Sequence, residues 1–195
     1  MSLFIALTNM YPLFMGFIKF FLLATLGDLI ARRIVSGSWT SKKMFLLERA
    51  FVWGMLGVLF TFIFPIFSAG VDALISKNLL PVFMTEPFAS ISTAFWKSFW
   101  INMIFAFPMM VFHRVTDTLI DQRKLFKKWP FLKTWKGIDW DNMWKVVAPT
   151  IIWFWIPAHT ITFYLPPEFR IIMAAALSTC LGAILSFSKL KAKRV

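Results

Sequence analysis

Seven polar side chains lie within, or at the ends of, long apolar stretches of this 195-residue sequence. They are Lys19, Asp28, Asp72, Lys97, Asn102, His159 and Thr162. Such groups are costly in apolar surroundings, so each needs a partner within the protein or a path to water. The chemistry that they offer is reversible binding of an ion or a small polar solute, and we treat them as a candidate polar pathway.

Spacing places part of this set on one helical face. Trp155, His159 and Thr162 are four and three residues apart, which brings them to the same side of a helix. We expect this face to point into the protein, because His and Thr would lose their hydrogen-bond partners against lipid. Lys19 and Asn102 lie at a similar depth in their own segments and are the expected neighbours.

Depth along the segments also predicts ion pairs. Lys19 and Asp28 are nine residues apart and lie on opposite sides of a helix, so each needs a partner elsewhere. Asp28 and Arg49 lie at one boundary, and Asp72 and Lys97 lie at the other, so we expect each of these pairs to meet. Two interpretations stay open: a polar vestibule that opens to the outside, and structural ion pairs that hold the helices together.

Covalent catalysis has little support in the sequence. The chain holds 2 His, and it contains neither Gly-x-Ser-x-Gly nor His-Glu-x-x-His. His113, Arg114 and Asp117 form a further polar group, which we interpret as charge pairing at the end of an apolar segment. We therefore expect no enzyme activity, no cofactor and no metal site.

Composition identifies the surroundings of these groups as lipid. The chain is 59% hydrophobic and 15% charged, whereas a soluble domain is about 25% charged. Five apolar segments have close to the ~20 residues that a helix needs to cross the hydrocarbon. They cover about 11–31, 50–75, 94–113, 146–165 and 169–188. The sequence predicts an all-α fold, with one integral membrane helical bundle over 1–195 and five spans, or four if the first segment does not cross.

Prolines within these segments predict kinked helices. Pro65, Pro108, Pro149 and Pro157 each remove a backbone donor and free a carbonyl one turn earlier. In lipid such carbonyls need partners inside the protein. Pro166-Pro167 is expected to end the fourth segment and to begin a tight turn.

The basic residues that give the chain its net charge of +12 are distributed as the predicted topology requires. Of the 21 Lys and Arg, five lie in the first connection, eight in the third and four after the fifth segment. With five spans these regions fall on one side, which we place inside, with the N-terminus outside. This pattern explains the charge without nucleic acid as a partner.

The third connection, 114–145, combines basic residues with Trp129, Trp135, Trp140 and Trp144. Trp prefers the headgroup level of a bilayer, and Lys attracts anionic lipid. We favour an amphipathic segment that lies on the membrane surface at anionic headgroups. The alternative is a docking site for a membrane-protein partner.

The C-terminal part resembles the signature of the Mpv-seventeen family, also called the twenty-two-kilodalton peroxisomal membrane protein family. That signature is Trp-Pro-x-x-Gln-x-x-Asn-Phe followed by Pro and Arg. Trp155, His159, Thr162, Phe163 and Pro167 fall at the matching spacings, with His in place of Gln and Thr in place of Asn. These departures look more like the prokaryotic relatives.

Weaker similarities occur in the same order along the chain. Gly27 and Asp28 resemble the Gly-Asp start of the family, and Ile184–Phe187 resembles its closing Tyr-Leu-Ser-Trp. Lys97 and Asn102 match a Lys and Asp pattern, with Asn for Asp. The resemblance implies a small multi-pass protein of a mitochondrial inner or peroxisomal membrane in eukaryotes, or of the cytoplasmic membrane in a prokaryote.

Two functions follow as hypotheses. Members of the family that the chain resembles are suspected of forming channels, which agrees with a channel or small-solute pathway through the polar groups of the outer half. The alternative is a structural or assembly protein without transport, in which the same groups only hold the bundle together. A homo-oligomer is compatible with both.

Overall fold

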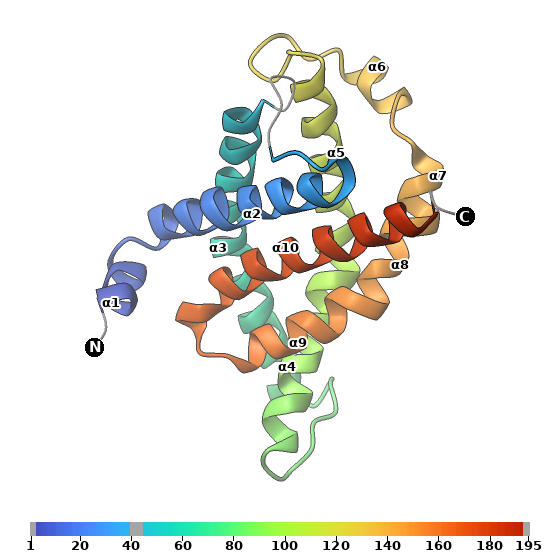
Figure 1. Ribbon diagram of the computed structural model, residues 1–195. Coiled ribbons are helices and arrows are strands. Elements are labelled where there is room, and N and C mark those ends of the chain that lie inside the picture. The colour runs from blue at the N-terminus through green and yellow to red at the C-terminus, as the bar shows by residue number, and fades with distance from the viewer. Residues whose placement is uncertain (1–2, 40–44, 193–195) are drawn as a thin grey trace. The chain divides into compact units, whose positions relative to one another are not determined.

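The structure, a computed structural model, describes residues 3–39 and 45–192, and every regular element within them is a helix (Figure 1). Contacts between residues divide the chain into two compact units. The first unit comprises Met1–Thr61, Ile120–Arg123 and Ile171–Val195, and the second comprises Phe62–Leu119 and Lys124–Arg170.

The first unit is built from α1 (Leu3–Met10), α2 (Pro12–Ser36), the first half of α3 (Leu46–Ser76) and most of α10 (Pro167–Ala192). Pro12 occupies the first turn of α2, where its missing N–H costs no helical hydrogen bond. Gly37 ends α2 with a φ of 71°, a left-handed conformation that glycine adopts without strain.

The second unit holds the rest of α3 and two long helices made of shorter pieces. One consists of α4 (Phe88–Ile101), the π-helical turn η1 (Asn102–Ala106) and α5 (Phe107–Asp121), whose last two residues belong to the first unit. The other consists of α7 (Trp140–Asn142), η2 (Met143–Val147), α8 (Ala148–Thr150), η3 (Ile151–Trp155) and α9 (Ile156–Tyr164). The short α6 (Phe131–Lys136) lies between them, and α4 packs along α9.

Five helices of the described chain are long and apolar enough to cross a membrane: Pro12–Ser36, Leu46–Ser76, Phe88–Asp121, Trp140–Tyr164 and Pro167–Ile184. This confirms the predicted all-helical fold with five such segments. The bounds of the third connection need correction, because the third helix continues to Asp121 and the fourth begins at Trp140. Residues 114–121 and 140–145, which were expected to lie in a loop, are therefore helical.

A buried cluster explains this longer third helix. Val115 and Leu119 are one turn apart on α5 and pack against Ile138 and Met143. Residues four apart share a helical face, so this apolar pair continues the buried side of the helix beyond the predicted end. The same contacts hold the chain that follows α5 against that helix.

Three of the four predicted proline kinks coincide with π-helical turns. Pro108, Pro149 and Pro157 each stand two residues after the end of η1, η2 or η3. A proline cannot bond the carbonyl four residues earlier, and its ring collides with that carbonyl in a regular helix. The wider π turn accommodates the ring, and π turns recur at functional sites. Pro65, in contrast, lies inside the continuous α3.

Small residues allow close helix contacts in the first unit. A Cβ atom added to Gly57 of α3 would collide with the backbone oxygen of Gly16 of α2. One turn further along α3, Thr61 Oγ1 donates to the Gly57 carbonyl at 2.9 Å. On the α10 side, a Cβ atom on Gly27 would lie 2.9 Å from Thr179 Cα, and Thr179 Oγ1 donates to the Leu23 carbonyl at 2.9 Å. Helix α2 therefore approaches α3 and α10 where side chains are smallest.

Replacement of the glycine at the closest approach tests this packing. Gly57→Ala should lower the free energy of unfolding by about 1–3 kcal/mol, because the backbone of α2 has to move away. Gly70→Ala is the matched control on α3, since a Cβ atom there meets nothing within 4 Å. It should be neutral or slightly stabilising, because Ala favours a helix over Gly. Thermal unfolding in detergent measures both, and equal losses would contradict the close approach.

Candidate functional site

The predicted Asp72–Lys97 ion pair is present in the second unit. Lys97 Nζ lies 2.8 Å from Asp72 Oδ1 and 2.9 Å from Asp72 Oδ2. The pair joins α3 to α4, and it is asymmetric, because the Lys97 side chain is 11% exposed and that of Asp72 is 55% exposed. A buried ammonium group thus meets a carboxylate that still reaches the surface.

The predicted polar face of the fourth span is buried. The exposed fractions are 9% for Trp155, 6% for His159 and 0% for Thr162. Thr162 Oγ1 donates to the Ala158 carbonyl at 3.0 Å, which satisfies its hydroxyl within α9. This result confirms that the three residues point into the protein rather than away from it.

Asn102 and His159 form the predicted contact between the third and fourth spans. His159 Nδ1 lies 3.1 Å from Asn102 Nδ2 and 3.3 Å from Asn102 Oδ1, so either tautomer of the imidazole finds a partner. Asn102 Nδ2 also donates to the Ser98 carbonyl at 2.8 Å. Ser98 Oγ in turn donates to the Ile156 carbonyl across the interface at 2.6 Å. These bonds join α4 to α9.

Two π-helical turns meet at this contact. Asn102 begins η1 and Trp155 ends η3, and the two turns lie against each other. Asn102 Nδ2 reaches the Trp155 carbonyl at 3.4 Å, so one amide group contacts the backbone of both helices. Backbone groups that π turns and prolines leave without a helical bond need such partners inside a bundle.

Aromatic rings enclose the histidine. The Phe64 ring meets the imidazole of His159 edge-on at 5.7 Å between centroids, and the Trp155 ring lies at 5.1 Å. Phe163 packs against Phe64 at 5.1 Å. Trp155 Nε1 is buried and makes no hydrogen bond to the residues that the structure describes. The polar contact is therefore narrow and has apolar walls.

A pocket of about 510 Å³ lies over α4 and the end of α9. Its lining consists of Glu86, Ala89, Ser90, Thr93, Ala94, Lys97, Phe163 and Tyr164. Glu86 accepts a hydrogen bond from Ser90 Oγ at 2.7 Å, and Lys97 carries the ion pair with Asp72. Sequence reasoning missed Glu86, Ser90 and Thr93, although the spacing of Ser90 and Thr93 with Lys97 is that of one helical face.

Arg170 fixes the end of α9 beside this pocket. Its Nε donates to the Leu165 carbonyl at 3.1 Å, and its terminal amino group donates to the Phe163 carbonyl at 3.2 Å. The guanidinium also lies over the Phe163 ring, 5.4 Å from its centroid. The side chain thus satisfies carbonyls that have no helical partner at a C-terminus.

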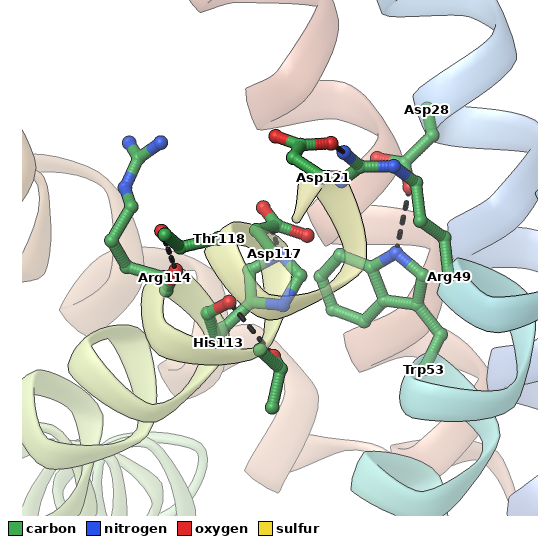
Figure 2. A network of polar contacts seen from close by, with 9 residues as sticks. Asp28, Arg49, Trp53, His113, Arg114, Asp117, Thr118 and Asp121 are labelled. Carbon is green, nitrogen blue, oxygen red and sulfur yellow. Dashed lines mark hydrogen bonds and ion pairs between the residues drawn. The ribbon is translucent and has the colours of Figure 1, made fainter. Parts of the chain in front are cut away.

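A separate polar group lies in the first unit. Arg49 donates to Asp121 Oδ1 at 2.7 Å, and Trp53 Nε1 donates to Asp28 Oδ2 at 2.9 Å (Figure 2). Arg49 and Trp53 are one turn apart on α3, so this end of the helix holds both carboxylates. The prediction that Asp28 meets Arg49 identified this end of α3 but missed Trp53 and Asp121. Asp121 was missed because it was placed in a loop.

Two turns earlier on α5, His113 Nε2 lies 3.7 Å from Asp117 Oδ2, a contact that is an ion pair only when the imidazole is protonated, so the charge pairing of His113, Arg114 and Asp117 stays a prediction (Figure 2). Lys19 belongs to the first unit, where its ammonium donates to Thr8 Oγ1 at 3.0 Å and lies 4.6 Å from the centre of the Phe4 ring. Asn102 and His159 belong to the second unit, so the predicted approach of Lys19 to them stays a prediction.

The described residues contain no group of three or more His, Cys, Asp or Glu side chains that could hold a metal ion. No protein-family model matches the chain, and no curated protein or solved structure matches it significantly. The length and apolarity of its five helices are compatible with a multi-pass membrane protein and indicate a membrane location.

A double-mutant cycle tests the Asp72–Lys97 pair. Asp72→Asn and Lys97→Met each leave one charge without its partner, whereas the double variant removes both. The two losses of stability should therefore not add, with a coupling of about 1 kcal/mol, a moderate value because Asp72 is half exposed. Asp141 and Lys145 form a control pair at 3.0 Å whose side chains are 83% and 73% exposed, and it should show almost no coupling. Strictly additive losses at Asp72 and Lys97 would mean that the pair does not form in detergent or bilayer.

Proposed function

We propose that this chain is a multi-pass membrane protein that passes small polar solutes along the polar face of α4. The proposed path begins in the pocket beside Glu86 and Lys97 and leads to the contact between Asn102 and His159. The observation that carries the proposal is the continuity of polar residues along this face, from exposed to buried positions.

The positions of these residues support a path rather than scattered polar contacts. Glu86 and Ser90 are exposed, Thr93 is half-buried, and Lys97 and Asn102 are buried. Glu86 precedes α4, whereas Ser90, Thr93 and Lys97 lie on α4, three and four residues apart, so these three follow one face. A solute on this face would exchange water for hydrogen bonds one turn at a time, which is how polar pathways cross apolar surroundings.

The Asn102–His159 contact is the narrow point of the proposed path. Its polar atoms bond one another, and the rings of Phe64 and Trp155 close its sides. The two π turns that carry it are local irregularities within long helices, and such turns recur at functional sites. In this proposal the structure represents a closed state, and passage requires α4 and α9 to separate at Asn102.

The resemblance of the Trp155–Pro167 region to the Mpv-seventeen family supports the same proposal, because members of that family are suspected of forming channels. Trp155, His159 and Thr162 lie on the buried face that the path would use. The residues in which this chain departs from the family pattern, His159 and Thr162, keep hydrogen-bonding groups at both positions.

A structural role is the second candidate, and one observation favours it. Ser98, Asn102 and Thr162 all find hydrogen-bond partners within the second unit. Such closed networks hold membrane helices together without any solute. The two candidates differ in whether the purified protein conducts.

Blocking the pocket distinguishes them. Thr93→Trp places an indole in the pocket and should lower solute flux by roughly tenfold or more, because a ring fills the entrance. Ile91→Trp is the control, since Ile91 is on the same helix, is 44% exposed and does not line the pocket. It should stay within about twofold of the wild-type flux, because its added ring faces away from the proposed path.

The measurement is conductance in planar bilayers together with swelling of proteoliposomes in small neutral solutes. Equal losses in Thr93→Trp and Ile91→Trp would exclude the pocket as the entrance. Wild-type protein that is folded by circular dichroism and passes neither ions nor neutral solutes would contradict the proposal and favour the structural role.

A further inference from the structure

The segment 124–139, called here the basic segment, lies outside the five long apolar helices. Helix α5 ends at Asp121 before it, and α7 begins at Trp140 after it. Both neighbouring helices are apolar enough to cross a membrane. The basic segment is therefore tied at each end to a helix that would lie in the bilayer, and it contains the short α6.

One side of the basic segment is fixed to the protein. Thr134 is 1% exposed and Ile138 is 6% exposed. Ile138 packs with Val115 and Leu119 of α5 in the buried cluster described above. The segment is thus held in place against its own unit, which determines which of its side chains face outward.

The outward side carries large apolar groups. Phe126 and Leu132 are 73% and 72% exposed, and Phe131 is 54% exposed. Phe131 stacks on Trp135 at 5.8 Å between ring centroids, so these two exposed rings form an ordered pair. A patch of this kind marks an interaction site on a water-exposed surface. Aromatic rings of this kind favour the headgroup level of a bilayer.

Lysines alternate with these apolar residues along the basic segment. Lys124, Lys127, Lys128, Lys133 and Lys136 are all part of the basic segment. The acidic residues that flank it in sequence are already engaged, since Asp121 is bound by Arg49 at 2.7 Å and Asp139 Oδ1 accepts from the Asn142 N–H at 2.9 Å. Lys127, Lys128, Lys133 and Lys136 are exposed and Lys124 is half-buried, so the segment presents positive charge at its surface.

We propose that the basic segment lies in the headgroup region and binds the phosphate groups of anionic phospholipids. Exposed aromatic and aliphatic groups insert at the level of the glycerol backbone, and the lysine ammonium groups bind the phosphates around them. Two observations select lipid over an acidic protein partner: the exposed aromatic rings favour the headgroup level of a bilayer, and both ends of the segment continue into apolar helices. This inference is independent of the proposed solute path.

The binding test uses the full chain in a neutral detergent. Phosphatidylglycerol, phosphatidylcholine and inorganic phosphate are added separately, and the thermal unfolding midpoint is followed against their concentration. Phosphatidylglycerol should raise the midpoint, whereas phosphatidylcholine and inorganic phosphate should not. Equal responses to the two lipids, or a response to inorganic phosphate alone, would overturn the proposal.

Charge-removing variants locate the site. The quadruple variant Lys127→Gln, Lys128→Gln, Lys133→Gln and Lys136→Gln should need roughly tenfold or more phosphatidylglycerol for the half-maximal rise, because each lysine near an anionic surface contributes to binding. The control variant loses the same charge elsewhere, through Lys42→Gln, Lys43→Gln, Lys189→Gln and Lys191→Gln. It should stay within about threefold of the wild type. The same loss in both variants would show general charge attraction and no site in the basic segment.

A fluorescent probe tests the depth of the outward side. Leu132→Cys in a Cys180→Ala background is labelled with an environment-sensitive dye and reconstituted in vesicles that contain phosphatidylglycerol. The emission should shift to the blue, and nitroxide groups on the lipid headgroups should quench it. A dye that remains in water, and becomes protected only when an acidic protein is added, would replace lipid by a protein partner.

Discussion

The structure depends on one constraint: polar groups in apolar helices must find their partners inside the protein. Asn102 shows how the constraint acts, because its amide contacts the backbone of its own helix at Ser98, the backbone of the fourth span at Trp155, and the ring of His159. A leucine there would leave the histidine and two carbonyls with one partner fewer. Asn102 and Ser98, which donates to the Ile156 carbonyl, together join α4 to α9.

Proline and π-helical turns are part of the same arrangement. Each of Pro108, Pro149 and Pro157 follows a π turn, and two of these turns meet at the Asn102–His159 contact. A proline within a helix leaves one backbone carbonyl without its helical hydrogen bond, so that carbonyl can accept from a side chain. Polar side chains of the second unit bond carbonyls close to these irregular turns: Ser98 Oγ donates to the Ile156 carbonyl, and Asn102 Nδ2 reaches the Trp155 carbonyl. Prolines, π turns and polar side chains thus occur together where α4 meets α9.

The features that could be predicted from the sequence follow from helical spacing and from the depth of a residue within its apolar segment. The five apolar helices follow from length and composition, the Asp72–Lys97 pair from matching depth, and the buried Trp155 face from helical spacing. Features that depend on tertiary contacts were missed. Trp53 gives no sign in the sequence that its indole binds Asp28, and the extension of α5 to Asp121 depends on contacts with Ile138 and Met143.

The central claim is that the polar face of α4 is in contact with water while the adjacent face is not. Single cysteines at Thr93 and Ile91, each in a Cys180→Ala background in liposomes, can be compared by their rate of reaction with a charged thiol reagent from outside. The account predicts that Thr93→Cys reacts at least roughly tenfold faster than Ile91→Cys, because the reactive thiolate forms only where water and charge are accommodated. Equal rates at the two positions would contradict the account.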